Sequence, residues 1–98
     1  MRLPEPLVAK ILSVVQKHFG SVNVYLFGSR VLDTGSGGDV DLAIESNLDP
    51  EDFSYRCEHV RYDLEQVDFP LPLDFVQWNS ATDPLLAAEL RAQAVLLK

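Results

Sequence analysis

The chain has 98 residues, 47% of them hydrophobic and 23% charged, which is enough for one compact core and too little for a second. We therefore expect a single domain over residues 1–98. Eight Lys and Arg against fifteen Asp and Glu give a formal net charge of −7, which disfavours direct binding to nucleic acid or to an anionic membrane. No apolar run approaches the roughly 20 residues that span a bilayer. The lone cysteine, Cys57, cannot form an internal disulfide and favours a reducing, cytoplasmic location.

The N-terminal segment predicts an amphipathic helix that ends at Gly20. Its apolar side chains recur at helical spacing and share one face: Leu7, Val8, Ile11, Leu12, Val15 and Phe19. Residues 22–27 are mostly β-branched or aromatic and have glycine and serine on both sides. This composition predicts a short buried strand that stops at Gly28 and Ser29.

The middle of the chain predicts a second strand and a second helix. In residues 39–44 apolar side chains alternate with Asp39 and Asp41, which predicts a strand with both acids on one face. Asp49 and Pro50 then favour a helix start. We expect this helix to bury one stripe of side chains: Phe53, Cys57, Val60, Leu64 and Val67.

The C-terminal third predicts a third strand over residues 73–78 and a last helix that begins at Asp83 and Pro84. Residues 94–97 either continue that helix or form a short edge strand. Helices that alternate with strands imply a sheet covered by helices. The predicted fold class is therefore α/β or α+β, with a small mixed β-sheet flanked by helices.

Asp39 and Asp41 form the first constellation that indicates chemistry. Two positions apart in a strand, they project from one face with Cα atoms about 7 Å apart. Two acids aimed the same way repel each other unless a cation lies between them. A hard divalent ion such as Mg2+ fits, because it prefers oxygen ligands and is commonly held by carboxylates together with substrate phosphates. Asp74, on another predicted strand, could supply a third oxygen site.

Gly28 and Ser29 form the second constellation, because a glycine directly after a strand lets backbone N–H groups approach an anion. Alone, such a pair is most often a plain turn, and an Asp-x-Asp is most often a solvated strand face. Together with Asp74 they are more specific and indicate metal-assisted phosphoryl or nucleotidyl transfer. The guanidinium of Arg30 either contacts a triphosphate or makes a surface ion pair.

Other conspicuous side chains favour structural interpretations. Cys57 lies on an apolar helix stripe and is expected in the core, and His18 and His59 are expected at the surface. Tyr25 and Trp78 are interpreted as core or interface residues rather than base-stacking groups. The charged side chains of the middle helix are interpreted as a solvated face, with a partner surface as the alternative: Arg56, Glu58, Arg61, Asp63 and Glu65.

These motifs resemble a known signature. Residues 24–30, followed after a short loop by residues 38–44, are similar to the motif of the polymerase-beta-type nucleotidyltransferase superfamily. More narrowly, the chain resembles the minimal nucleotidyltransferase (MNT) domains, which carry only the catalytic core. Residues 68–75 resemble the segment with that family's third acid, and residues 90–97 its closing helix and strand. The chain has Val31, Leu32 and Asp33 where relatives often carry Arg-Gly, and Gly38 where Ser is usual.

The resemblance implies a role for each matching residue. Gly28 and Ser29 would hold the nucleoside triphosphate, with Arg30 beside them. Asp39 and Asp41 would bind Mg2+. Asp74 would complete the metal site and act as general base.

The resemblance also implies a partner, because minimal nucleotidyltransferases typically pair with a separately encoded helical protein of the HEPN class. The implied activity is Mg2+-dependent transfer of AMP from ATP to a hydroxyl of that partner, in a toxin–antitoxin pair. A non-catalytic antitoxin that blocks its partner by contact is the alternative. Transfer to a small molecule is a third possibility. Homo- and hetero-oligomers both remain open.

Overall fold

The computed structural model describes residues 3–28 and 40–97, in which three helices and four strands form. The helices and strands are, in chain order, α1 (Glu5–Phe19), β1 (Val24–Phe27), β2 (Val40–Glu45), α2 (Pro50–Gln66), β3 (Leu73–Trp78), α3 (Pro84–Gln93) and β4 (Val95–Leu96). The strands form one sheet in the order β3-β2-β1-β4. β1 pairs antiparallel with β2 and with β4, whereas β2 and β3 are parallel. The predicted small mixed sheet with flanking helices is confirmed.

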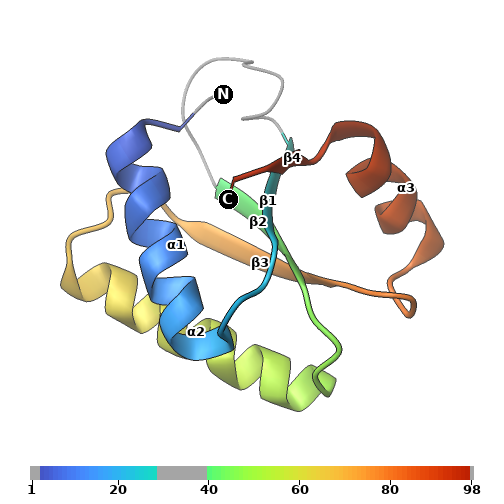
Figure 1. The fold of residues 1–98 in the computed structure, drawn as a ribbon, viewed down its shortest axis with the longest axis horizontal. Coiled ribbons are helices and arrows are strands. Elements are labelled where there is room, and N and C mark those ends of the chain that lie inside the picture. Colours follow the sequence, from blue (N-terminus) through green and yellow to red (C-terminus); the bar gives the residue numbers. More distant parts are fainter. Residues whose placement is uncertain (1–2, 29–39, 98) are drawn as a thin grey trace.

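α1 and α2 cover one face of the sheet, and α3 lies on its other side (Figure 1). Alternate strand residues turn toward α1 and α2, as the period of two requires. The resulting core contains fourteen buried residues: Leu3, Val8, Ile11, Val15, Val24, Leu26, Val40, Leu42, Ile44, Phe53, Cys57, Val60, Leu64 and Leu73. This layer supplies most of the buried apolar surface that holds the strands in place.

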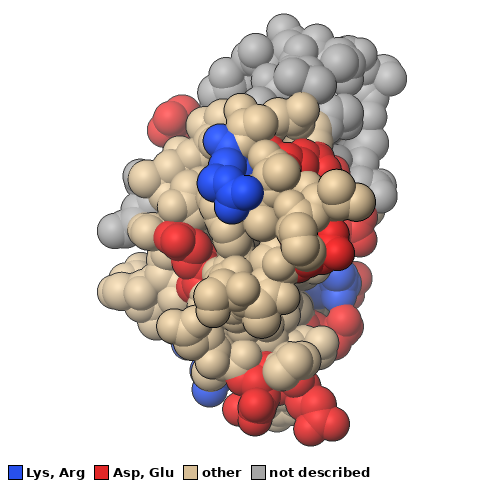
Figure 2. Space-filling model, turned by 90° about the vertical axis from the view of Figure 1, so that its right-hand side faces the viewer, with Lys and Arg blue, Asp and Glu red and all other residues tan. Residues whose placement is uncertain are grey.

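The opposite face of the sheet carries a smaller cluster. Phe27, Ala43 and Leu90 are buried there, and half-buried Tyr25 and Trp78 pack against them. The Tyr25 and Trp78 rings meet edge to face with centroids 4.8 Å apart, which confirms their interpretation as packing residues. Acidic side chains outnumber basic ones on the side of the molecule that carries α3 (Figure 2).

The helix starts show one difference from the expected capping. Asp83 caps α3 with its side chain, since its Oδ2 accepts hydrogen bonds from the backbone N–H groups of Leu85 (3.1 Å) and Leu86 (3.2 Å). Asp49 occupies the corresponding position of α2 but makes no such side-chain bond. Its backbone carbonyl alone accepts from the N–H of Phe53, at 2.8 Å.

Two predictions about element ends are resolved. Residues 95–96 form an edge strand, so the strand alternative for the C-terminus is right. Val67 was expected to be buried with the α2 stripe, and this was wrong: it is the C-cap residue and 46% exposed. A helix that ends one residue earlier no longer directs that side chain into the core. In the described part of the chain, no helix is long and apolar enough to cross a membrane.

Candidate functional site

Three of the predicted site residues lie on neighbouring strands or directly after one. Asp41 of β2 is in register with Asp74 of the parallel strand β3. On the other side of β2, Asp41 is paired with Phe27, the last residue of β1, and Gly28 follows directly. Neighbouring strands lie about 4.8 Å apart, and paired residues project from the same face. The sheet therefore brings Gly28, Asp41 and Asp74 side by side.

Gly28 and Asp41 lie so close together that a larger residue at position 28 would clash with Asp41. Gly28 has a φ of +85°, a conformation that side chains rarely adopt. A Cβ built on it would collide with Oδ2 of Asp41 and lie 3.3 Å from Asp41 Cγ. Gly20 has a similar φ of +77°, yet a Cβ there would meet nothing within 4 Å. Of these two described glycines, Gly28 is the one that leaves room for the Asp41 carboxylate.

The two acids differ in exposure. Asp41 is half-buried, as expected for a residue whose neighbours Val40 and Leu42 are fully buried on the other face of the strand. Asp74 is exposed, although it lies between the apolar residues Leu73 and Phe75 in sequence. Because β3 is an edge strand, the Asp74 carboxylate stays in contact with water, which lowers the cost of placing an acid between two apolar residues.

A small pocket at the edge of β3 includes Glu58 and Arg61, which the sequence interpretation assigned to a solvated face. It measures about 170 Å3, and Asp74 lines it together with Ser54, Glu58 and Arg61 of α2. Arg61 donates to Glu58 Oε2 (2.6 Å) and to the carbonyl of Leu73 (3.0 Å), and its guanidinium lies 5.2 Å from the Phe75 ring centroid. Arg61 follows the buried Cys57 by one helical turn, the one sequence signal that it flanks the core.

The remaining predicted site residues, Ser29, Arg30 and Asp39, lie outside the described residues. Within residues 3–28 and 40–97, no group of three His, Cys, Asp or Glu side chains is placed to hold a metal ion. The expected metal pair Asp39 and Asp41 is therefore represented in the structure by Asp41 alone. The pair that the structure does bring together is Asp41 with Asp74.

The chemistry of this pair fits a hard cation. Two carboxylates on one face of adjacent strands repel each other, and their oxygens are the ligands that Mg2+ prefers. Gly28 adopts its positive φ directly after β1, next to Asp41. The arrangement can therefore supply oxygen ligands from two adjacent strands, with the backbone of Gly28 close to one of them.

Two side chains outside the predicted site, Cys57 and His18, can be compared with their predicted burial. Cys57 is buried in the core as expected, and burial raises the pKa of its thiol to about 12, so that it is not a nucleophile at neutral pH. His18 was expected at the surface and is instead largely covered, with 19% of its side chain exposed. Its Nε2 lies 2.7 Å from Asp63 Oδ2, a contact between α1 and α2.

Asp63 also accepts a hydrogen bond from Lys17 Nζ at 2.9 Å. The hydrogen bonds from His18 and Lys17 hold the pKa of the Asp63 carboxyl below its usual range. This polar contact joins α1 to α2 at a distance of about 45 residues in the chain, which no local sequence pattern could indicate.

Comparison with solved structures shows the same fold in three toxin–antitoxin complexes. The first is the tri-AMPylated HEPN toxin of Shewanella oneidensis in complex with its MNT antitoxin (21% identity, 96% of this chain and 71% of that chain, TM-score 0.68). The second is the toxin–antitoxin MntA-HepT (19%, 97% and 72%, 0.68). The third is a toxin–antitoxin with AMP-PNP (24%, 93% and 72%, 0.71). Comparison with curated protein sequences found no match.

The family comparison covers nearly the whole chain. The model of the family described as polymerase beta, nucleotidyltransferase, matches residues 9–98. This range contains every strand of the sheet and both acids that the sheet places in register. The chain therefore belongs to the polymerase beta nucleotidyltransferase family.

Proposed function

We propose that this protein is a Mg2+-dependent nucleotidyltransferase that transfers AMP from ATP to a hydroxyl of a HEPN-type partner protein and thereby acts as an antitoxin. The observation that carries the proposal is the register of Asp41 with Asp74 beside Gly28, in a chain of the nucleotidyltransferase family. Structures of similar fold support the choice of substrate and acceptor. One contains a tri-AMPylated HEPN toxin with its MNT antitoxin, and another contains AMP-PNP.

In this proposal the carboxylates of Asp39, Asp41 and Asp74 hold Mg2+, and Gly28, Ser29 and Arg30 hold the triphosphate. When bound, Mg2+ supplies positive charge that offsets the phosphate charge as it shifts toward the leaving group. Gly28 keeps the backbone close to the phosphates and leaves space for the Asp41 carboxylate at the same time. A side chain at position 28 would interfere with both.

The reaction forms one bond and breaks one bond. The acceptor oxygen bonds to the α-phosphorus of ATP, and the bond from that phosphorus to the β-phosphate oxygen breaks, so pyrophosphate leaves. The acceptor hydroxyl releases its proton to Asp74, which is exposed and therefore within reach of a protein acceptor. Because ATP is the donor and the single thiol needs no oxidising environment, we place the protein in the cytoplasm.

The decisive experiment starts with the protein alone. In an NMR titration with Mg2+ and a non-hydrolysable ATP analogue, we expect Mg2+-dependent shifts at Gly28, Asp41 and Asp74. A second assay would follow label from ATP carrying 32P at the α-phosphate into a co-purified HEPN-type partner. Label should reach the partner with the wild-type chain and not with the Asp41→Asn/Asp74→Asn variant.

Two outcomes would overturn the proposal in different ways. Undiminished label transfer by the folded double variant would remove the assigned metal and base residues. Neutralisation of the partner without any label transfer, and without shifts in the titration, would replace catalysis with inhibition by contact.

A further inference from the structure

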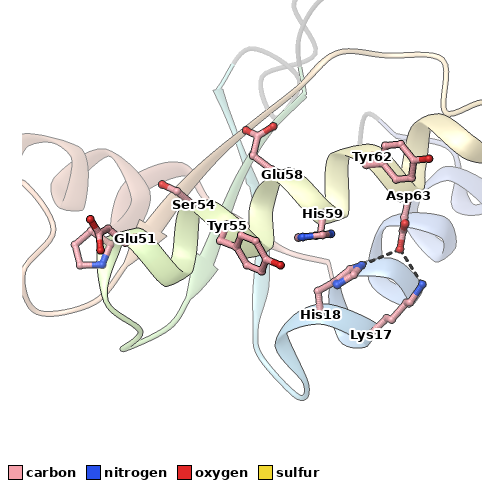
Figure 3. A pocket seen from close by; sticks show the side chains of 10 residues that line it. Lys17, His18, Glu51, Ser54, Tyr55, Glu58, His59, Tyr62 and Asp63 are labelled. Atoms are coloured by element: carbon pink, nitrogen blue, oxygen red, sulfur yellow. Dashed lines mark hydrogen bonds and ion pairs between the residues drawn. The ribbon is translucent and has the colours of Figure 1, made fainter.

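A wide groove lies on the outer surface of α1 and α2, away from the face of the sheet that carries Asp41. It measures about 980 Å3 and is lined by Lys17, His18, Pro50, Glu51, Ser54, Tyr55, Glu58, His59, Tyr62 and Asp63 (Figure 3). Eight of these residues belong to α2 and two to the C-terminal end of α1. The nucleotide chemistry proposed above uses none of them.

Several aromatic rings line this groove. Tyr55, His59 and Tyr62 are spaced at i, i+4 and i+7 on α2 and therefore share one helix face. The Tyr55 ring meets His59 edge on, with centroids 4.4 Å apart, and His59 lies 5.6 Å from His18 of α1. The two tyrosines are 64% and 58% exposed, a large solvent contact for rings of this size.

The cations near the groove are already engaged. Lys17 donates to Asp63 at 2.9 Å. Arg56 donates to the carbonyl of His18 at 2.6 Å, and Arg61 donates to Glu58 and to the carbonyl of Leu73. Both arginines of α2 thus make hydrogen bonds to the protein itself, and neither lines the groove.

The acids of the groove leave it with a negative balance. Glu51, Glu58 and Asp63 outnumber the two cations paired with them, Lys17 on Asp63 and Arg61 on Glu58, which gives a formal charge of −1 with neutral histidines. Glu51 and Glu58 lie at i−4 and i+3 from Tyr55, so each acid lies about one helical turn from it along α2. The Glu58 side chain is 72% exposed even with Arg61 bound to it.

Exposed aromatic rings in a groove that also carries carboxylates offer the chemistry that recognises a guanidinium. Arginine stacks flat on aromatic rings and donates to carboxylates with the same planar group. A polyanion such as RNA would be repelled by the same acids. A second copy of this chain, at a net charge of −7, offers poor charge complementarity.

We propose that the groove formed by α1 and α2 docks an arginine-bearing segment of the protein acceptor. Ser54 and Glu58 line this groove and also line the pocket that contains Asp74, so the docked segment and this pocket would share one stretch of α2. Docking here would hold the acceptor next to the transfer site without covering it. That the docked protein is the acceptor rests on the proposed function; the affinity of the groove for arginine does not.

The test uses the full chain and a short acetylated alanine-based peptide with three arginines on one helical face. The matched control peptide carries citrulline at those positions, which keeps the planar group and removes the charge. We expect saturable NMR shifts at Tyr55, His59 and Tyr62 with the arginine peptide. Binding should weaken by about tenfold or more with citrulline, and also with the variant Tyr55→Ala/Tyr62→Ala.

The matched control variant is Leu85→Ala on α3, because Leu85 is 82% exposed and lies outside the groove. It should leave peptide affinity unchanged, and circular dichroism should show all variants folded. No binding, equal binding of the citrulline peptide, or equal binding by the double tyrosine variant would overturn the proposal. Because this titration contains neither ATP nor Mg2+, its result is independent of whether the nucleotide site works.

Discussion

On the face of the sheet that α1 and α2 cover, Leu42 and Ile44 have no exposed surface, whereas on the opposite face Asp41 is half-buried and Asp74 is exposed. The same strands supply both sets, because successive residues project to opposite sides. One face gains its stability from buried apolar surface. The other keeps two like charges near water, where their mutual repulsion is screened.

This difference shows how a chain of 98 residues can hold a polar site without weakening its core. The neighbours of Asp41 in sequence hold it in place, because Val40 and Leu42 are both fully buried. Substitutions one residue apart on β2 should therefore have different consequences. The predictions below test that separation.

The largest effect on stability is expected for Leu42→Ala on the covered face. Leu42 is fully buried in the main cluster, so truncation removes apolar contacts and leaves a cavity. We expect the free energy of unfolding to fall by about 2–5 kcal/mol, measured by urea denaturation. A loss below about 1 kcal/mol would mean that the core at β2 relaxes easily and that the two faces differ less than the burial indicates.

Asp41→Asn, one residue away, should reverse this pattern. We expect Mg2+-dependent nucleotidyl transfer to fall by about 100-fold or more, because the proposed metal ligand loses its charge. The free energy of unfolding should change by less than about 1 kcal/mol, since a half-buried acid is replaced by a residue of equal size. The control is Glu45→Gln, an exposed acid on the same face of β2, which should leave transfer unchanged. Equal losses in the two variants would contradict the assignment.

Gly28→Ala and Gly20→Ala form a matched pair that sharpens the role of the Asp41 carboxylate. Both positions have positive φ, so each substitution should cost about 1–3 kcal/mol of stability. Only at position 28 does the new Cβ force the Asp41 carboxylate to move. The Mg2+ concentration for half-maximal transfer should therefore rise in Gly28→Ala and stay unchanged in Gly20→Ala. An identical Mg2+ dependence in both variants would show that Gly28 does not position Asp41.

The smallest effect is expected for Asp63→Asn, at the polar contact between α1 and α2. Hydrogen bonds from His18 and Lys17 lower the pKa of Asp63 in the folded state. The unfolded chain therefore binds a proton at Asp63 at higher pH than the folded chain does. The contribution of this contact to the free energy of unfolding is thus present at neutral pH and is lost as pH falls below about 4. The difference in Tm between wild type and variant should shrink as pH is lowered from 7 to 3. A constant difference would argue against the ion pair.

Much of the fold followed from local patterns. The apolar spacing of α1, the alternation in residues 39–44 and the Asp83-Pro84 start of α3 each predicted the element that forms. Gly28 at the end of β1 was also placed correctly. The error at Val67 lies at a helix end, where only one or two residues decide which side chains remain on the buried face.

The candidate site was predictable in its residue types and only in part in its geometry. The alternation of acids with apolar residues placed Asp41 on the outward face of its strand. It did not show that Asp74 is in register with Asp41 or that β3 is an edge strand, because pairing of strands depends on the whole sheet. Arg61 was assigned to a solvated face because its partner, the carbonyl of Leu73, is twelve residues away.

The sequence by itself therefore determined the order of helices and strands, the two chemically distinct faces of the sheet and the acids of the candidate site, since each follows from spacing along the chain. Tertiary structure alone decided which acids meet, which glycine makes room for a carboxylate and how Tyr55, His59 and His18 come to line one groove. These contacts join residues from different elements. Their geometry is set by packing through space, which local periodicity does not encode.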